Sequence, residues 1–452
     1  KAGKDPQMFC DQISQTFRDL SDTLNLSNTD FIRTTEARHK KTVQHLWSEL
    51  EKNDDIYLSN YSGWYSVSDE AFYNEDEIEE IDGKKIAISS KSSVEWIEEE
   101  SYFFRLSKWE KLLLNYYEAN PDFISPVSRK NEVISFVKSG LKDLSISRKS
   151  FSWGIPVPNN QHHVIYVWLD ALTNYLSALN YPNTDDDLFK KFWPASIHLI
   201  GKDILRFHAV YWPAFLLAAK IDLPKKVYGH GWILSGEEKM SKSKGNILDP
   251  LEIIKEYGLD PLRYYLIKEV SFGNDGNISQ ERLEDCINSD LANNYGNLCQ
   301  RVTAFAIKNC DGKIPSIIKF QDEDLLILNK FKDNLDNIRS KIDDQNINFY
   351  IDYIVNSLFE ANKYFNDQEP WKKKDDLIRL NTIVYTTLEI VRKISFLLYP
   401  IIPESSLKAL KIFDIKENKV KLNTITNNEF LTKGNNLNKI DILFKKIEKN
   451  ND

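Results

Sequence analysis

The sequence predicts an α/β fold in which a small antiparallel β module precedes a parallel sheet and an all-helical region follows it. Three observations lead to this prediction. Strand-like and helical stretches alternate over residues 126–225, which is typical of a parallel sheet. Short β-type runs separated by turn residues fill residues 56–104, and helical spacing dominates after Gly276.

The composition is that of a folded protein. Of the 452 residues, 42% are hydrophobic and 28% are charged, which excludes a disordered or fibrous chain. No apolar run approaches the roughly 20 residues of a membrane span, and the first residues lack the apolar core of a signal peptide. The net charge is −8. A lysine and arginine excess from Trp371 onward permits local contact with a polyanion but argues against a general nucleic-acid coat.

The elements follow in order along the chain. Residues 1–53 have helical spacing, and this pattern ends at the polar residues that begin with Asn53. Four β-type runs then predict the small antiparallel module, with an acidic stretch over residues 70–82 on its solvent edge. These runs cover residues 56–58, 63–67, 85–88 and 94–97. Residues 102–117 return to helical spacing.

The region after this module predicts the parallel sheet. Strands are expected at 163–168, 196–201 and 226–229, with helices from Asp170 and over 204–219. Parallel sheets bind ligands at the carboxyl ends of their strands, so the polar residues that follow these runs are the first candidates for chemistry. Beyond Gly276, residues 347–365 place apolar side chains on one helix face. From residue 417 we expect a loop and a terminal helix.

The most informative segment covers residues 236–246, where three lysines alternate with serines and end at Gly245. Lysines supply point charges for phosphate oxygens, and the backbone of a small-residue loop adds donors. A solvated hairpin tip is the alternative for a generic lysine- and serine-rich segment. Residues 239–243, however, read K-M-S-K-S, which is similar to the signature of class I aminoacyl-tRNA synthetases.

Further segments resemble methionyl-tRNA synthetases in collinear order over nearly the whole chain. They are residues 94–96, 102–107, 166–175, 201–204, 207–208, 212–214 and 230–232. The resemblance implies a Rossmann-like catalytic domain, incomplete at its N-terminus, and a helical anticodon-binding bundle. It divides the chain into the first part of the catalytic domain (1–53), a connecting module (54–125), the second part (126–225), the K-M-S-K-S region (226–275) and the bundle (276–452).

The resemblance also implies site residues. Lys242 would stabilise the ATP phosphates together with Mg²⁺ as pyrophosphate leaves, while Lys239 and Ser241 shape the loop. Arg148 would organise acidic groups near the active site. The ATP-binding residues would be Gly201, Asp203, His230 and Ile233. The methionine pocket would contain Trp168, Tyr175, Phe207, His208 and Trp212.

An aromatic pocket suits methionine, because aromatic walls accommodate its polarizable thioether and a polar group can approach the sulfur. Core packing is the alternative role for each aromatic taken singly. His198, His162 and His163 are interpreted as core or structural residues.

In the helical region, Asn297, Arg301 and Trp371 match the anticodon-reading positions of the family. An unpaired base stacks on an aromatic ring while asparagine or arginine reads its edge. A capping hydrophobe at a helix end is the alternative for Trp371.

Two departures from the family pattern stand out. None of the seven histidines lies in an H-I-G-H motif, so we expect a chain that starts late and adenylates poorly by itself. Ser66 and Asp69 stand where a zinc-binding cysteine pair would fall. The four cysteines have no C-x-x-C spacing, so we expect reduced thiols and no structural zinc.

The resemblance therefore implies a methionine–tRNA ligase that uses methionine, ATP and methionine tRNA. The alternatives are a class I synthetase for another amino acid, such as leucine or cysteine, and a non-catalytic tRNA-binding relative. We expect a monomer without membrane association, in a bacterial cytoplasm or an organelle.

Overall fold

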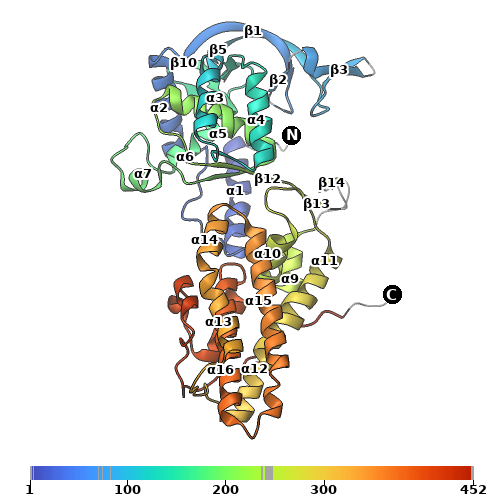
Figure 1. Ribbon diagram of the computed structural model, residues 1–452. Helices are drawn as coiled ribbons and strands as arrows, with labels where there is room; N and C mark the ends of the chain where they lie inside the picture. Colours follow the sequence, from blue (N-terminus) through green and yellow to red (C-terminus); the bar gives the residue numbers. More distant parts are fainter. Residues whose placement is uncertain are drawn as a thin grey trace. The chain divides into compact units, whose positions relative to one another are not determined.

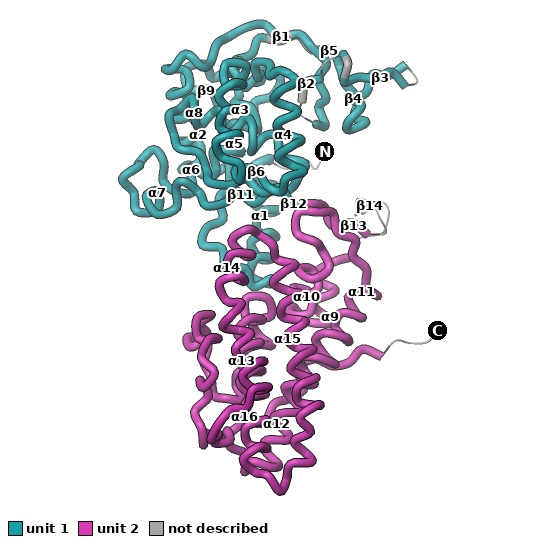
Figure 2. Tube along the Cα trace, in the orientation of Figure 1, with its two compact units in different colours: residues 1–230 teal, residues 231–452 magenta. Residues whose placement is uncertain are grey.

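The computed structural model describes residues 3, 5–69, 71–73, 75–81, 83–235, 238–239 and 248–448. The chain forms two compact units, Lys1–His230 and Gly231–Asp452 (Figure 2). Each unit has a hydrophobic core of its own.

The first unit begins with two helices, α1 (Pro6–Thr23) and α2 (Ala37–Lys52). They confirm the helical prediction for this region, although residues 24–36 between them are not helical. The Asp5 side chain caps α1 by accepting from the backbone of Met8. The buried face of α2 includes Val43, Leu46 and Leu50, which recur at the spacing of an amphipathic helix.

The predicted antiparallel module follows (Figure 1). Strand β1 (Ile56–Ser66) pairs with β5 (Glu95–Phe104) along most of its length and with β2 (Ala71–Tyr73) at its end. Strands β3 (Ile78–Ile81) and β4 (Lys84–Ala87) form a separate hairpin. Residues 102–104, which were expected to begin a helix, complete β5 instead. Their three aromatic side chains favour a strand.

A parallel sheet of three strands belongs to the first unit. Its order is β11 (His198–Gly201), β12 (Val227–His230) and β6 (Ile124–Ser125), and both pairings are parallel. The strands predicted at 196–201 and 226–229 are therefore confirmed.

The prediction for residues 163–168 is partly wrong. Strand β10 (Asn160–Ile165) pairs antiparallel with β8 (Ser147–Arg148) and β9 (Pro156–Val157). Residues 167–168 belong to helix α5 (Val167–Leu172). A short buried apolar run has no periodicity that separates strand from helix, so its end could not be predicted.

The remaining helices of the first unit are short and connect its strands (Figure 1). The single helix predicted over 204–219 is divided into a 3-10 turn η3 (Lys202–Ile204), a π-helix η4 (Phe207–Tyr211) and α8 (Trp212–Ala218). The others are η2 (Leu106–Trp109), α3 (Glu110–Ala119), α4 (Val127–Lys138), α6 (Asn174–Ser177) and α7 (Asp187–Phe192), with the short β7 (Leu144–Ser145) pairing with β5.

The second unit begins with a small sheet and continues as helices. Strand β13 (Ile233–Ser235) pairs with β14 (Glu238–Lys239) and with β15 (Gly276–Asn277). The helices are α9 (Pro250–Tyr257), α10 (Leu259–Glu269), α11 (Gln280–Cys286), the π-helix η6 (Ile287–Gly296), α12 (Asn297–Asn309), α13 (Asp322–Asp333), α14 (Leu335–Asp343), α15 (Ile347–Asp367), α16 (Leu377–Leu398) and α17 (Pro403–Leu410), with 3-10 turns η7 (Pro370–Lys372), η8 (Lys411–Phe413), η9 (Glu417–Lys419) and η10 (Leu422–Thr426).

Helix α15 confirms the helix expected over 347–365, and Tyr350, Ile354 and Leu358 are buried along its face. The terminal helix expected after residue 417 is not found in the part described, which extends to Glu448 and contains only 3-10 turns and irregular chain.

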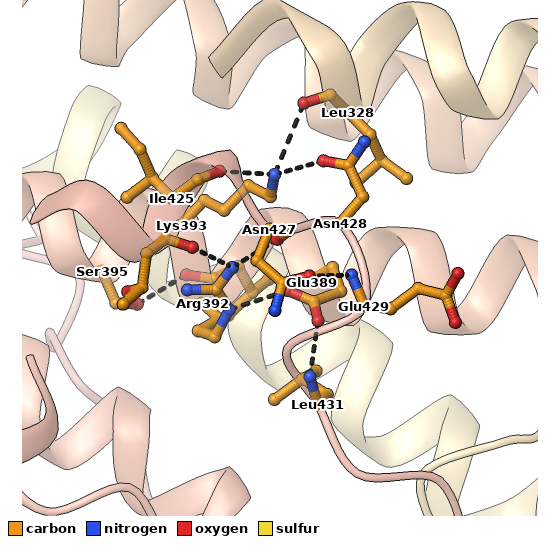
Figure 3. Close-up of polar contacts among 12 residues, drawn as sticks. Leu328, Glu389, Arg392, Lys393, Ser395, Ile425, Asn427, Asn428, Glu429 and Leu431 are labelled. Atoms are coloured by element: carbon orange, nitrogen blue, oxygen red, sulfur yellow. Dashed lines mark hydrogen bonds and ion pairs between the residues drawn. The ribbon is translucent and has the colours of Figure 1, made fainter. Parts of the chain in front are cut away.

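Helix α16 carries three fully buried charged side chains (Figure 3). Arg392 Nε lies 2.7 Å from Glu389 Oε2. Lys393 Nζ donates to Ile425 O and to Asn428 Oδ1, each at 2.6 Å. We call Glu389, Arg392 and Lys393 the α16 charge cluster. Burial lowers the pKa of Lys393 to about 7.

The α16 charge cluster holds the segment 424–431 against the bundle. Glu389 Oε1 accepts from the backbone N–H of Leu431 at 2.6 Å, and Arg392 Nη2 donates to Asn427 O at 3.0 Å. These bonds satisfy backbone groups of an irregular segment that would otherwise be buried without partners.

Candidate active site and RNA-binding surface

Three of the predicted nucleotide-binding residues lie together at the carboxyl end of the parallel sheet. Gly201 ends β11 and is the register partner of His230, which ends β12. Asp203 follows in the next turn and is exposed. A Cβ atom on Gly201 would lie 2.6 Å from Asp203 Oδ1, so only glycine lets this carboxylate lie against the end of the strand.

The five residues predicted to form the methionine pocket make one continuous aromatic cluster. Trp168 and Phe207 stack with ring centroids 3.6 Å apart and planes 8° from parallel. Trp168 lies edge-on to His208 at 6.3 Å, and the Tyr175 ring lies 5.7 Å from His208 and 6.3 Å from Trp212. We call Trp168, Tyr175, Phe207, His208 and Trp212 the aromatic cluster.

Hydrogen bonds define the protonation of His208 within the aromatic cluster. Its Nδ1 lies 3.0 Å from the carbonyl oxygen of Ile204, which can only accept. Burial lowers the pKa of His208, so the ring is neutral near pH 7 and its Nε2 carries no proton. The Tyr175 hydroxyl, 2.8 Å from Nε2, is therefore the donor.

His198 also belongs to this site, which the sequence interpretation missed. It is buried, as expected, but its ring stacks on Tyr175 at 3.9 Å and its Nε2 accepts from Trp212 Nε1 at 3.3 Å. Burial and the nearby His208 lower its pKa to about 3. The position of His198 on the strand that ends at Gly201 could have indicated from the sequence that it lies near the site.

Short helical segments position the aromatic cluster. Trp168 lies on α5 and Tyr175 on α6. Phe207 and His208 lie on the π-helix η4, and Trp212 begins α8. The wider turn of a π-helix changes the direction of side chains relative to an α-helix, and such turns are frequent at functional sites.

The aromatic cluster is closed in this structure. With their ring centroids 3.6 Å apart, Trp168 and Phe207 leave no space for a ligand atom between them. A methionine side chain must therefore use another face of the cluster or separate these two rings.

Arg148 lies outside the aromatic cluster, on β8. It is buried and donates from Nη1 to Ser145 Oγ at 2.8 Å and to Ser147 O at 2.7 Å. Its guanidinium also faces the rings of Tyr65 and Tyr166, at 5.3 and 4.8 Å from their centroids. Its expected role with acidic groups stays a prediction.

The lysine-rich motif belongs to the second unit. Lys239 pairs through its backbone with Leu234 in the β13–β14 hairpin. Ser241 and Lys242 lie outside the described residues. Ile233 is 41% exposed on β13, so its side chain is accessible to a ligand.

At the position expected for a zinc-binding cysteine pair, Asp69 lies in a cluster of hydroxyl groups. It accepts from Ser90, Ser92 and Tyr73. Burial opposes ionisation, but these hydrogen bonds outweigh it and lower the pKa of Asp69. Nowhere in the described ranges do three or more His, Cys, Asp or Glu side chains form a group that could hold a metal ion.

The predicted anticodon residues lie on one surface of the second unit. Asn297 is exposed at the start of α12, and Arg301 lies one turn further along the helix. The Arg301 guanidinium lies 5.0 Å from the centroid of the Phe365 ring, which in turn lies 6.1 Å from the ring of Trp371. Trp371 is 41% exposed. Phe365, predicted only as a core residue, thus links Arg301 to Trp371.

Arg301 has unused hydrogen-bonding capacity. Its Nε and Nη2 atoms are buried and have no hydrogen-bond partner among the residues the structure describes. Desolvation lowers the pKa of its guanidinium. Buried donors without acceptors are costly, and a ligand that supplies oxygen or nitrogen acceptors would remove that cost.

Comparison with known proteins agrees with both regions. Residues 1–303 match the family model described as tRNA synthetases class I (M), and residues 314–452 match the anticodon binding domain of methionyl tRNA ligase. The fold and the site thus define a class I aminoacyl-tRNA synthetase. The chain belongs to the methionyl-tRNA synthetase family.

Individual relatives are similar over most of their length. A methionine–tRNA ligase of Brucella suis is 49% identical over 421 residues, covering 93% of this chain and 81% of the relative. One of Rickettsia felis is 48% identical, covering 98% and 86%. The structure of Mycobacterium tuberculosis methionyl-tRNA synthetase in complex with methionyl-adenylate has a TM-score of 0.94 and 44% identity, covering 98% of this chain and 88% of that one.

Among the helices described, none is both long and apolar enough to cross a membrane.

Proposed function

We propose that this chain is a methionine–tRNA ligase in which the aromatic cluster binds methionine and the end of the parallel sheet binds ATP. The observation that carries the proposal is the closeness of these two sets of residues. Gly201 ends β11, Asp203 lies in the turn that follows, and the π-helix that bears Phe207 and His208 begins one turn later. An amino acid on the cluster would thus be near a nucleotide on the strand ends.

The proposed reaction has two steps. A methionine carboxylate oxygen attacks the α-phosphorus of ATP, the bond from that phosphorus to the bridging oxygen of the β-phosphate breaks, and pyrophosphate leaves. A ribose hydroxyl at the end of methionine tRNA then attacks the acyl carbon, the bond from that carbon to the phosphate oxygen breaks, AMP leaves with the bonding electrons, and the hydroxyl proton is released to AMP or to water. Positioning and charge stabilisation suffice for both steps, so no protein nucleophile is needed.

Each proposed residue has a role that fits its chemistry. The Asp203 carboxylate can accept hydrogen bonds from both ribose hydroxyls of ATP. His230 and Ile233 would lie along the adenosine. Lys242, with Lys239 and Ser241 shaping the loop, would neutralise charge on the departing pyrophosphate, and Mg²⁺ would share that charge.

The aromatic cluster offers methionine a neutral environment. Both buried histidines have lowered pKa values, so no net charge faces the uncharged thioether. The Tyr175 hydroxyl donates to His208, and its oxygen can contact the sulfur. Shape and sulfur contacts would then separate methionine from leucine and isoleucine.

The second unit would recognise the anticodon. Trp371 offers an exposed ring for a base, and Arg301 offers unused donors for a base edge or phosphate. The domain division given above, with residues 276–452 as the anticodon-binding region, is part of the proposal, as are a monomeric state and a location in a bacterial cytoplasm or an organelle.

The decisive experiment is ATP–pyrophosphate exchange by the complete gene product with each of the twenty amino acids. We expect exchange with methionine only. Lys242→Ala should reduce it by about a hundredfold to a thousandfold, while Lys220→Ala, at an exposed position of the first unit, should leave it unchanged. Exchange with leucine or cysteine would establish another specificity, and no exchange at all would favour a non-catalytic tRNA-binding protein.

A further inference from the structure

One histidine outside the aromatic cluster contacts the two helices that carry Trp168 and Tyr175. His39, on α2, is fully buried. Its Nε2 lies 2.6 Å from Asp170 Oδ1, and its Nδ1 lies 2.9 Å from Ser177 Oγ. Both ring nitrogens are therefore within hydrogen-bonding distance of a polar partner.

The Asp170 carboxylate can only accept, so His39 Nε2 is the donor of the first hydrogen bond. The Ser177 hydroxyl lies 2.9 Å from His39 Nδ1 and 3.0 Å from the carbonyl oxygen of Thr173. With the ring proton on Nε2, Nδ1 can accept from this hydroxyl, so one ring contacts both partners at once.

These two bonds reach both short helices that carry the walls of the proposed pocket. Asp170 lies on α5 with Trp168, and Ser177 lies on α6 with Tyr175. The helices have only six and four residues. Helices this short are not stable by themselves, so tertiary contacts must determine their orientation.

We infer that His39 is a positioning residue of the methionine pocket, which fixes Trp168 and Tyr175 relative to each other by clamping α5 and α6 to α2 through Asp170 and Ser177. The inference rests on the proposed pocket. His39 touches no substrate in this role; it acts through the two helices.

Three substitutions in the complete gene product test this role. His39→Ala removes both bonds. His39→Gln retains one amide donor toward Asp170 and loses the bond to Ser177. The matched control is Thr42→Val on the same face of α2, which removes a buried bond of 2.7 Å to the carbonyl oxygen of Tyr181 but touches neither Asp170 nor Ser177.

The KM values for methionine and for ATP are measured by pyrophosphate exchange, and methionine binding is measured by calorimetry. We expect His39→Ala to raise the KM for methionine by about tenfold to a hundredfold and to leave the KM for ATP unchanged. His39→Gln should give a smaller rise. Thr42→Val should lower the melting temperature without changing either KM.

The inference is overturned if His39→Ala leaves the KM for methionine within about twofold of wild type, or raises the two KM values equally. If His39→Ala does not fold, the same criteria apply to His39→Gln. Trp168→Ala tests the proposed pocket separately from the role of His39. If this variant binds methionine as well as wild type does, the proposed pocket is wrong, whatever the result for His39.

Discussion

Each unit contains a cluster of side chains joined by hydrogen bonds, and the two clusters differ in charge and in burial. In the first unit, the aromatic cluster and His198 are held by neutral hydrogen bonds, and Tyr175 and Phe207 are only partly buried. In the second unit, the α16 charge cluster is ionic and has no exposed surface. The Glu389 carboxylate contacts Arg392 and the backbone N–H of Leu431, and Lys393 donates to the carbonyl oxygen of Ile425.

This difference is the one expected between a ligand-binding site and a set of structural contacts. A group that must exchange protein contacts for ligand contacts has to be reachable, and neutral aromatic contacts cost little to rearrange. A buried ion pair is costly to open, because each charge is left without compensation. The first cluster is therefore suited to binding a ligand and the second to holding a segment in place.

The largest expected effect is on folding. Glu389→Ala leaves Arg392 buried without its carboxylate, and we expect the free energy of unfolding to fall by about 3–5 kcal/mol, measured by urea denaturation. Glu404→Ala, which breaks an exposed pair with Lys408 in the same unit, should have almost no effect. Equal losses in the two variants would show that burial does not distinguish the α16 charge cluster.

The next effect is on tRNA. Trp371→Ala should weaken tRNA binding by about 1–3 kcal/mol, because a stacking surface for an unpaired base is lost. Aminoacylation should show this as a higher KM for tRNA, with pyrophosphate exchange unchanged. Phe359→Ala removes another exposed aromatic of the same unit and should be neutral. A neutral Trp371→Ala would remove this residue from the proposed anticodon surface.

A smaller effect depends on pH. The pKa of Lys393 is lowered to about 7 in the folded protein, whereas the unfolded chain keeps the ordinary value near 10.4. Between these values the unfolded state binds more protons, so stability rises with pH. Wild type should gain on the order of 1 kcal/mol per pH unit between pH 7 and 9 relative to Lys393→Met. The measurement is the urea midpoint at each pH.

Lys408→Met, at an exposed position, is the control and should follow wild type. Parallel curves for wild type and Lys393→Met would contradict the lowered pKa.

The smallest expected effect is an absence of change in the first unit. The pKa of His208 is lowered by burial, so the ring stays neutral when the pH falls from 8 to 7. Methionine binding, followed by calorimetry, should be constant over this range. A marked loss of affinity at pH 7 would mean that the histidine takes up a proton and that the cluster is not neutral.

Regular elements of the fold could be predicted because periodicity reports them. The face of α15 and the strands β11 and β12 were found in this way. The end of β10 and the division of residues 204–219 into three kinds of helix were not found. A short buried run has no period, and a π-helix depends on the packing around it.

Residues of the candidate site could be proposed from the sequence where they lie in motifs, but not where their partners are distant in sequence. Trp168 and His208 belong to segments with a recognisable family pattern. His39 and Asp170 are 131 positions apart, and Phe365 contributes by lying between Arg301 and Trp371. Such pairs exist only in the folded chain, so no local pattern in a single sequence indicates them.

The contacts of α16 have a consequence for how the C-terminal segment can be shortened. If residues 425–431 were removed or cleaved away, a carboxylate, a guanidinium and an amine would remain in the bundle interior without the oxygens and N–H groups that they now contact. The irregular segment is thus part of the packed interior of the bundle. Proteolysis within it is expected to destabilise the helices as well as to remove surface residues.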